Sequence, residues 1–150
     1  MRADEFIDLY ALRQVGEVSE REVVEWGELR VTDDDRVMPI AILSASALQH
    51  EVDAAIEQVA AAMSVALPAE SMVALLAILA RCRQIRDGAV TPIAGSRSLA
   101  AIGRRFPDVQ QSVAVFIGIL DDYDDRLLSE EDVTSQVVDH VRRLITRAES

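Results

Sequence analysis

The chain has few of the residues that form cross-links or metal clusters. Its 150 residues include one cysteine, Cys82, and two histidines, and they include neither lysine nor asparagine. A single cysteine excludes a disulfide framework within the chain and a zinc site of the multi-cysteine kind. A chain of this length can bury a sizeable hydrophobic core without such cross-links.

Aromatic residues and long apolar runs are also scarce. Only six residues are aromatic, although half of the chain is hydrophobic, and this composition suits close helix packing better than a β-sandwich or barrel. The apolar runs are shorter than the roughly 20 residues that a membrane helix requires, and the N-terminus turns acidic where a secretion signal turns apolar. We therefore expect one all-α domain over residues 1–150, in the cytoplasm and without a membrane partner.

Acidic residues are in excess, and they are unevenly distributed. The chain has 26 acidic and 15 basic residues, for a net charge of −11. Residues 1–70 contain 15 of the acids and five arginines, whereas residues 71–150 contain 11 acids and ten arginines. An acidic field repels nucleic acid and attracts basic protein surfaces. The charge therefore disfavours nucleic-acid binding and favours a basic protein partner, with solubility as the alternative explanation.

The longest apolar run lies in the middle of the chain. Met72–Ala80 is a stretch of nine apolar residues with no interior Gly or Pro, and such residues form helices readily. Pro68 suits a first helical turn, and Gly88 suits a left-handed helix end. A second apolar region, at about 107–120, has apolar side chains on opposite sides of its predicted helix. Together they predict a bundle of about six or seven helices in which two, at about 68–87 and 107–120, are largely enclosed.

The remaining helices are predicted from apolar periodicity and capping residues. Ser19 and Glu22 have the spacing of a capping box, which predicts a helix that starts at residue 20. Ser96 can cap another short helix. The expected ranges are 4–15, 20 to about 31, 48 to before 67, a short helix after 96, and 130 to about 147.

Two segments have competing interpretations. Residues 29–43 can form a short hairpin, but Pro39 fits the first turn of a helix, so we favour a helix. Asp121–Asp125 contains four acids that would oppose the dipole at a helix C-terminus, so the preceding helix should end at or before them.

Two acidic surfaces with one aromatic residue each are candidates for binding a basic partner. Their carboxylates can accept hydrogen bonds from Arg and Lys, while the aromatic ring packs against the partner. Solvated turns explain the same acids, and a core position explains the tryptophan. The candidate partner-binding residues are Glu22, Glu25, Trp26, Glu28, Asp33, Asp34, Asp35, Asp121, Asp122, Tyr123, Asp124 and Asp125.

No pattern in the chain predicts an enzyme, a cofactor or a metal. A calcium loop that starts at Asp121 would need Gly where Arg126 stands and Glu where Asp132 stands. His50 and His140 have no partner with zinc-ligand spacing. Cys82 lies between two arginines, but its place in the helix pattern favours a buried residue.

The N-terminal third contains two patterns, Phe6-Ile7-x-x-Tyr10-Ala11-Leu12 and Gly16-Glu17-Val18-Ser19-Glu20-x-Glu22-Val23-Val24-Glu25-Trp26, and a weaker similarity runs from Phe106 to Asp121. On these residues the chain resembles small all-helical bacterial proteins of the immunity type, which are encoded beside polymorphic toxins. The resemblance implies no catalytic residues.

A second resemblance is to helical domains of the tellurite-resistance type. The helix starts at Gly16-Glu17-Val18-Ser19-Glu20 and Asp87-Gly88-Ala89-Val90-Thr91 are similar to theirs. The chain departs from that pattern at Pro92-Ile93-Ala94, where acids are expected.

The sequence therefore predicts an acidic binding protein that neutralises a basic protein partner, such as a toxin domain, by occlusion. The alternatives are a structural or regulatory domain that forms homo-oligomers through alanine-rich helix faces, and a tellurite-resistance-like domain.

Overall fold

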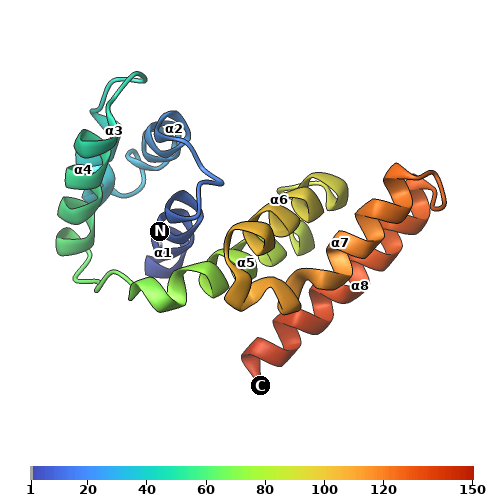
Figure 1. Cartoon of the computed structure of the whole chain (residues 1–150). Helices are drawn as coiled ribbons and strands as arrows, with labels where there is room; N and C mark the ends of the chain where they lie inside the picture. The colour runs from blue at the N-terminus through green and yellow to red at the C-terminus, as the bar shows by residue number, and fades with distance from the viewer. Residues whose placement is uncertain (1) are drawn as a thin grey trace. The chain divides into compact units, whose positions relative to one another are not determined.

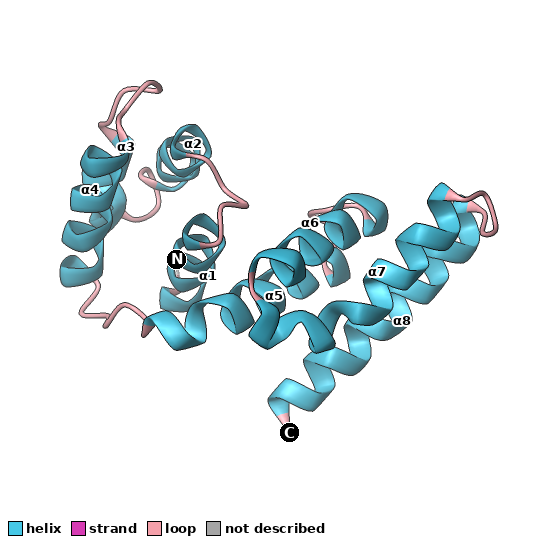
Figure 2. Ribbon diagram, in the orientation of Figure 1, coloured by secondary structure: helices cyan, strands magenta, loops and turns pink. Residues whose placement is uncertain are grey.

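The computed structural model describes residues 2–150, and all regular structure in this range is helical (Figures 1 and 2). The prediction of an all-α fold is confirmed, with eight α-helices and two 3-10 helices among the described residues. The count exceeds six or seven partly because of the four-residue helix α3. The helices are α1 (Ala3–Gln14), α2 (Glu20–Arg30), η1 (Asp35–Val37), α3 (Met38–Ala41), α4 (Gln49–Ala62), α5 (Glu70–Arg86), α6 (Pro92–Arg105), η2 (Pro107–Val109), α7 (Gln110–Asp124) and α8 (Glu130–Glu149).

The chain divides into two compact units, residues 1–73 and 74–150, and the boundary falls in α5. We call them the N-terminal unit and the C-terminal unit and describe each by itself. That the chain forms a single domain stays a prediction.

The N-terminal unit packs α1 to α4 around one hydrophobic cluster. The predicted capping box at the start of α2 is present, because Ser19 Oγ accepts the Glu22 N–H at 3.2 Å and the Glu22 carboxylate accepts the Ser19 N–H at 3.4 Å. Val23 is fully buried in the cluster, and Val18 packs against it. The buried members of the cluster are Phe6, Leu9, Val23, Val37, Ile40, Val52, Ala55, Ile56, Val59, Ala60 and Met63.

The segment 29–43 is helical, so the hairpin alternative is wrong. Asp34 caps η1 by accepting the Arg36 N–H at 3.1 Å. Pro39 occupies the first turn of α3, where its missing N–H breaks no helical hydrogen bond. Ile40 is fully buried, and α3 packs against both α2 and α4.

The C-terminal unit packs α6, α7 and α8 against one another, and α7 and α8 run side by side (Figure 1). The prediction that Ser96 caps a helix is wrong, because α6 already begins at Pro92. Thr91 Oγ1 accepts the Ala94 N–H at 3.3 Å, and a Thr cap followed by Pro is a strong helix start. Ser96 therefore lies inside α6, where it is buried.

The prediction that a helix ends at or before Asp121 is also wrong, since α7 continues to Asp124. Asp124 pairs with Arg97 of α6 at 2.8 Å, which offsets its repulsion by the helix dipole. Asp121 and Asp122 are exposed, and hydration and salt screen their charges there. The turn after α7 closes at Arg126, whose φ of 62° lies in the left-handed region.

The two helices predicted to be largely enclosed each have exposed apolar side chains, at the start of α5 and along one side of α7, while residues 76–85 of α5 are all buried or half-buried. In α5, Met72 is 47% exposed and Leu75 is 39% exposed, and in α7 Val115 is 37% exposed. The opposite faces are buried, for example at Ala77 and Phe116.

Two glycines of the C-terminal unit should respond oppositely to alanine. A Cβ on Gly103 of α6 would overlap Val113 Cγ2 of α7, whereas a Cβ on Gly118 would meet open space. Overpacking costs about 1–3 kcal/mol, while alanine gains about 1 kcal/mol of helix propensity. We therefore expect Gly103→Ala to lower the free energy of unfolding and Gly118→Ala to raise it, as measured by urea unfolding with circular dichroism. Shifts of the same sign would contradict this packing.

Candidate partner-binding surface

The acids of α2 lie at the surface of the N-terminal unit. Glu22, Glu25 and Glu28 are all exposed. Glu22 holds the capping box, and Glu25 pairs with Arg21 one turn earlier at 3.2 Å. Glu28 has no ion-pair partner among the residues that the structure describes. These carboxylates are accessible to a partner, and only one of them is engaged by a basic side chain of the unit itself.

Trp26 lies at the edge of the hydrophobic cluster and is half-buried. Its ring centroid is 6.3 Å from that of Phe6. The Arg30 guanidinium lies 4.6 Å from the Trp26 ring centroid and donates to the Trp26 carbonyl at 3.2 Å. Arg30 also pairs with Glu5 at 3.7 Å. The ring is therefore held in place by its own unit, which favours the core interpretation, and its role in binding stays a prediction.

The three aspartates after α2 differ in their surroundings. Asp33 and Asp35 are exposed, but Asp34 is buried and accepts hydrogen bonds from Arg36 Nη2 at 2.6 Å and from Arg36 Nε at 2.9 Å. These hydrogen bonds lower the pKa of Asp34 to about 2. Asp34 therefore serves the fold of this turn, and its two neighbours remain the accessible acids.

The second predicted set belongs to the C-terminal unit. Asp121, Asp122 and Asp125 are exposed, and Tyr123 is half-buried. Asp124 accepts from Arg97 Nη2 at 2.8 Å, which lowers the pKa of Asp124. Since the two sets lie in separate units, each has to be considered as a surface of its own.

Large apolar side chains at the surface near α2 were missed in the sequence. Leu29 of α2 is 78% exposed, Ile42 after α3 is 72% exposed, and Met38 is also exposed. A helical projection of α2 could have found Leu29, because it falls away from the buried Val23 and Gly27. The contact between α2 and α3 is made by Gly27 and Ile40. Leu29 and Ile42 each lie two residues from it, on the outer side of their own segment, and Glu25 and Glu28 share the outer side of α2 with Leu29. We call this set the α2–α3 surface: Glu25, Glu28, Leu29, Met38 and Ile42.

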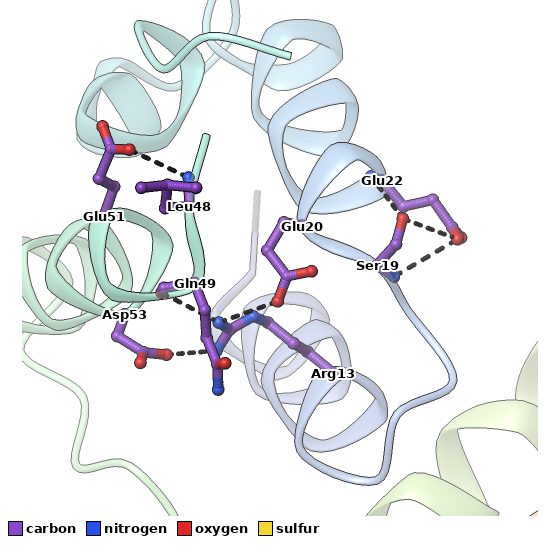
Figure 3. Close-up of polar contacts among 8 residues, drawn as sticks. All are labelled: Arg13, Ser19, Glu20, Glu22, Leu48, Gln49, Glu51 and Asp53. Carbon is purple, nitrogen blue, oxygen red and sulfur yellow. Dashed lines mark hydrogen bonds and ion pairs between the residues drawn. The ribbon is translucent and has the colours of Figure 1, made fainter. Parts of the chain in front are cut away.

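A buried arginine was also missed. Arg13 of α1 is buried, and its guanidinium reaches toward α2 and α4 (Figure 3). Nη1 donates to Asp53 Oδ1 at 2.6 Å, while Nη2 donates to the Gln49 carbonyl at 3.3 Å and to Glu20 Oε1 at 3.4 Å. Arg13 follows Leu9 by one helical turn, so both lie on the apolar side of α1. A cation on that side of the helix is the feature of the sequence that indicates a buried arginine.

A cleft of about 330 Å³ lies beside this guanidinium. Its charged lining consists of Arg13 with Glu20, Asp53 and Glu57, so acids outnumber bases. A cationic side chain of a partner fits this cleft better than an anion. The cleft therefore extends the acidic character of the N-terminal unit to α4 and the start of α2.

No group of three His, Cys, Asp or Glu side chains within residues 2–150 is arranged to hold a metal ion. Burial raises the pKa of the Cys82 thiol to about 12, so the thiol is uncharged at neutral pH. None of the described helices is both long and apolar enough to cross a membrane.

Comparison of the chain with protein-family models, with curated proteins and with solved structures gives no match. The immunity-type and tellurite-resistance resemblances therefore stay predictions. Function has to be inferred from the chemistry of the surface.

Removing Asp53 should destabilise the N-terminal unit, because it takes the closest acceptor from a buried guanidinium. We expect Asp53→Ala to lower the free energy of unfolding by about 1.5 kcal/mol, the lower end for a charged hydrogen bond, since Asp53 is itself half exposed. Urea unfolding followed by Trp26 fluorescence measures this change. Glu57→Ala, one turn along α4 in the same cleft, is the matched control and should change stability by less than about 0.5 kcal/mol. Equal effects would show that Arg13 does not depend on Asp53.

The Asp34 carboxyl should titrate with a midpoint of about 2 in an NMR experiment that follows its carboxyl carbon. Because its pKa is lower in the folded state than the unfolded value of about 3.9, the pair stabilises the fold above pH 4. This stabilisation is lost as the pH falls toward 2. Arg36→Gln should move the midpoint up toward the unfolded value. A wild-type midpoint near 4 would contradict the pairing.

Proposed function

We propose that the chain is a cytoplasmic protein that binds a basic protein partner, such as a toxin domain, and neutralises it by occlusion through the α2–α3 surface. The observation that carries this proposal is the exposure of Leu29 on the same side of α2 as Glu25 and Glu28, together with the exposure of Ile42 directly after α3. Apolar anchors surrounded by charged groups of one sign are typical of protein interfaces with a partner of the opposite charge.

The acids and the apolar side chains make different contributions to such binding. Residues 1–73 contain 15 acidic residues and five arginines, a field that accelerates the encounter with a basic partner. An exposed ion pair contributes only about 0–1 kcal/mol, whereas burying a leucine or isoleucine contributes about 1.5–3 kcal/mol. The acids should therefore govern the association rate, and Leu29 and Ile42 should govern the dissociation rate.

The other candidate residues support this surface to different degrees. Glu22, Asp33 and Asp35 are exposed on α2 and on the turn that follows it, and they extend the acidic border. Asp34 and Trp26 act indirectly, because they hold the turn and the inner side of α2. Asp121, Asp122 and Asp125 offer a second acidic contact in the C-terminal unit.

The test is growth rescue by co-expression with a basic toxin domain encoded beside this gene, together with binding kinetics of the purified pair. Wild-type protein should restore growth. Leu29→Asp combined with Ile42→Asp should raise the dissociation rate about 100-fold or more and abolish rescue. Glu25→Arg combined with Glu28→Arg should slow association mainly at low salt.

Matched controls lie outside both candidate surfaces. Leu48 at the start of α4 is 59% exposed, so Leu48→Asp tests whether any exposed apolar residue has the same effect. Asp108→Arg combined with Glu149→Arg tests the reversal of two exposed acids elsewhere. The proposal is wrong if these controls equal the α2–α3 variants, or if wild-type protein binds no basic partner. Sedimentation that shows a salt-independent homo-oligomer, abolished by the Leu29 and Ile42 changes, would favour self-association instead.

A further inference from the structure

A groove of about 480 Å³ crosses the surface of the C-terminal unit between α5, α7 and α8. Its apolar lining comes from Leu75, Ile78 and Leu79 of α5, Val115 of α7 and Leu144 and Ala148 of α8. Leu75 and Val115 are more than one-third exposed. The groove is therefore an apolar surface that the described helices leave open to solvent.

The charged lining of this groove is entirely basic. Arg143 and Arg147 lie one turn apart on α8, with His140 one turn before Arg143, and no carboxylate lines the groove. Arg143 Nη2 pairs with Asp139 Oδ2 at 2.8 Å, and Asp139 lies outside the lining. The Arg147 guanidinium has no ion-pair partner among residues 2–150. In a chain with a net charge of −11, this combination marks a place where an anion meets favourable charge.

We propose that this groove binds an alkyl carboxylate, with the hydrocarbon tail on α5 and α7 and the carboxylate at Arg147 and Arg143. Arginine has a planar fork of N–H donors that matches a carboxylate. The tail removes water from Leu75 and Val115, which are otherwise exposed. Gln111 and Ser112 add neutral polar groups at the other side of the groove.

The size of the groove favours a small amphiphile over a protein partner. Small-molecule pockets have volumes of about 300–1,000 Å³, and the groove falls within this range. A stable protein interface buries about 800 Å² on each partner, which extends well beyond the six apolar residues that line the groove. The proposal concerns the C-terminal unit and is independent of the α2–α3 surface.

The test uses the full chain and decanoate as the probe, with binding measured by calorimetry and by NMR shifts. Decanoate should bind, while decanol and decyltrimethylammonium, which have the same tail without the negative charge, should bind at least about tenfold more weakly. Arg147→Glu should weaken decanoate binding about tenfold or more. Val115→Gln should weaken it about threefold or more.

Two control variants separate the groove from the general surface. Arg142→Glu changes a neighbouring arginine of α8 that does not line the groove, and Leu127→Gln changes an exposed leucine in the turn between α7 and α8 that does not line it either. Both should bind decanoate like the wild type. Circular dichroism confirms that each variant is folded.

Four results would overturn the proposal. Absence of decanoate binding would do so directly, and equal binding of decanol would show an apolar site without recognition of the anion. Unchanged binding in both Arg147→Glu and Val115→Gln would place the ligand elsewhere. Sedimentation that shows self-association, lost in Val115→Gln and unaffected by decanoate, would assign the groove to a second copy of the chain.

Discussion

The N-terminal unit depends on the buried guanidinium of Arg13. A buried charge is costly unless it is paired, and the partners of Arg13, which itself lies on α1, come from α2 and α4. Docking α4 on α1 is therefore coupled to placing Asp53 and the Gln49 carbonyl around this group. The need to pair the Arg13 guanidinium also orients α2, because Glu20 at the start of α2 accepts a hydrogen bond from it. With its inner side fixed in this way, α2 presents Glu25, Glu28 and Leu29 outward.

Parts of the fold could be predicted because their causes are local. Ser19 and Glu22 form a capping box through atoms only three residues apart, so the start of α2 follows from the sequence alone. Pro39 excluded a central strand for the same local reason. The end of α7 could not be predicted, because the partner of Asp124 is Arg97, 27 residues away on another helix. Ser96 was misassigned because Thr91 and Pro92 start the helix earlier.

The candidate site was predictable in its charge but not in its composition. The acids of α2 are visible in the sequence, and most of them lie at the surface. That Asp34 is engaged by Arg36 while Asp33 and Asp35 are exposed depends on the turn geometry. The exposure of Ile42 depends on the shortness of α3, which buries Ile40 between α2 and α4 and then ends. Ile40 and Ile42 are equally apolar, and the sequence pattern does not tell which of them is buried.

The two units have surfaces of opposite character, and this limits how the chain can associate with itself. The α2–α3 surface combines acids with apolar side chains, while the groove near Arg147 combines arginines with apolar side chains. Such surfaces are complementary, so one copy could meet the next head to tail. A head-to-tail contact gives a closed ring only when the rotation from one copy to the next returns to the first copy. Otherwise it gives open filaments. A net charge of −11 on every copy opposes this growth. The excess of acids in the N-terminal unit therefore opposes contact between copies, and the same excess is what the proposed binding of a basic partner would use.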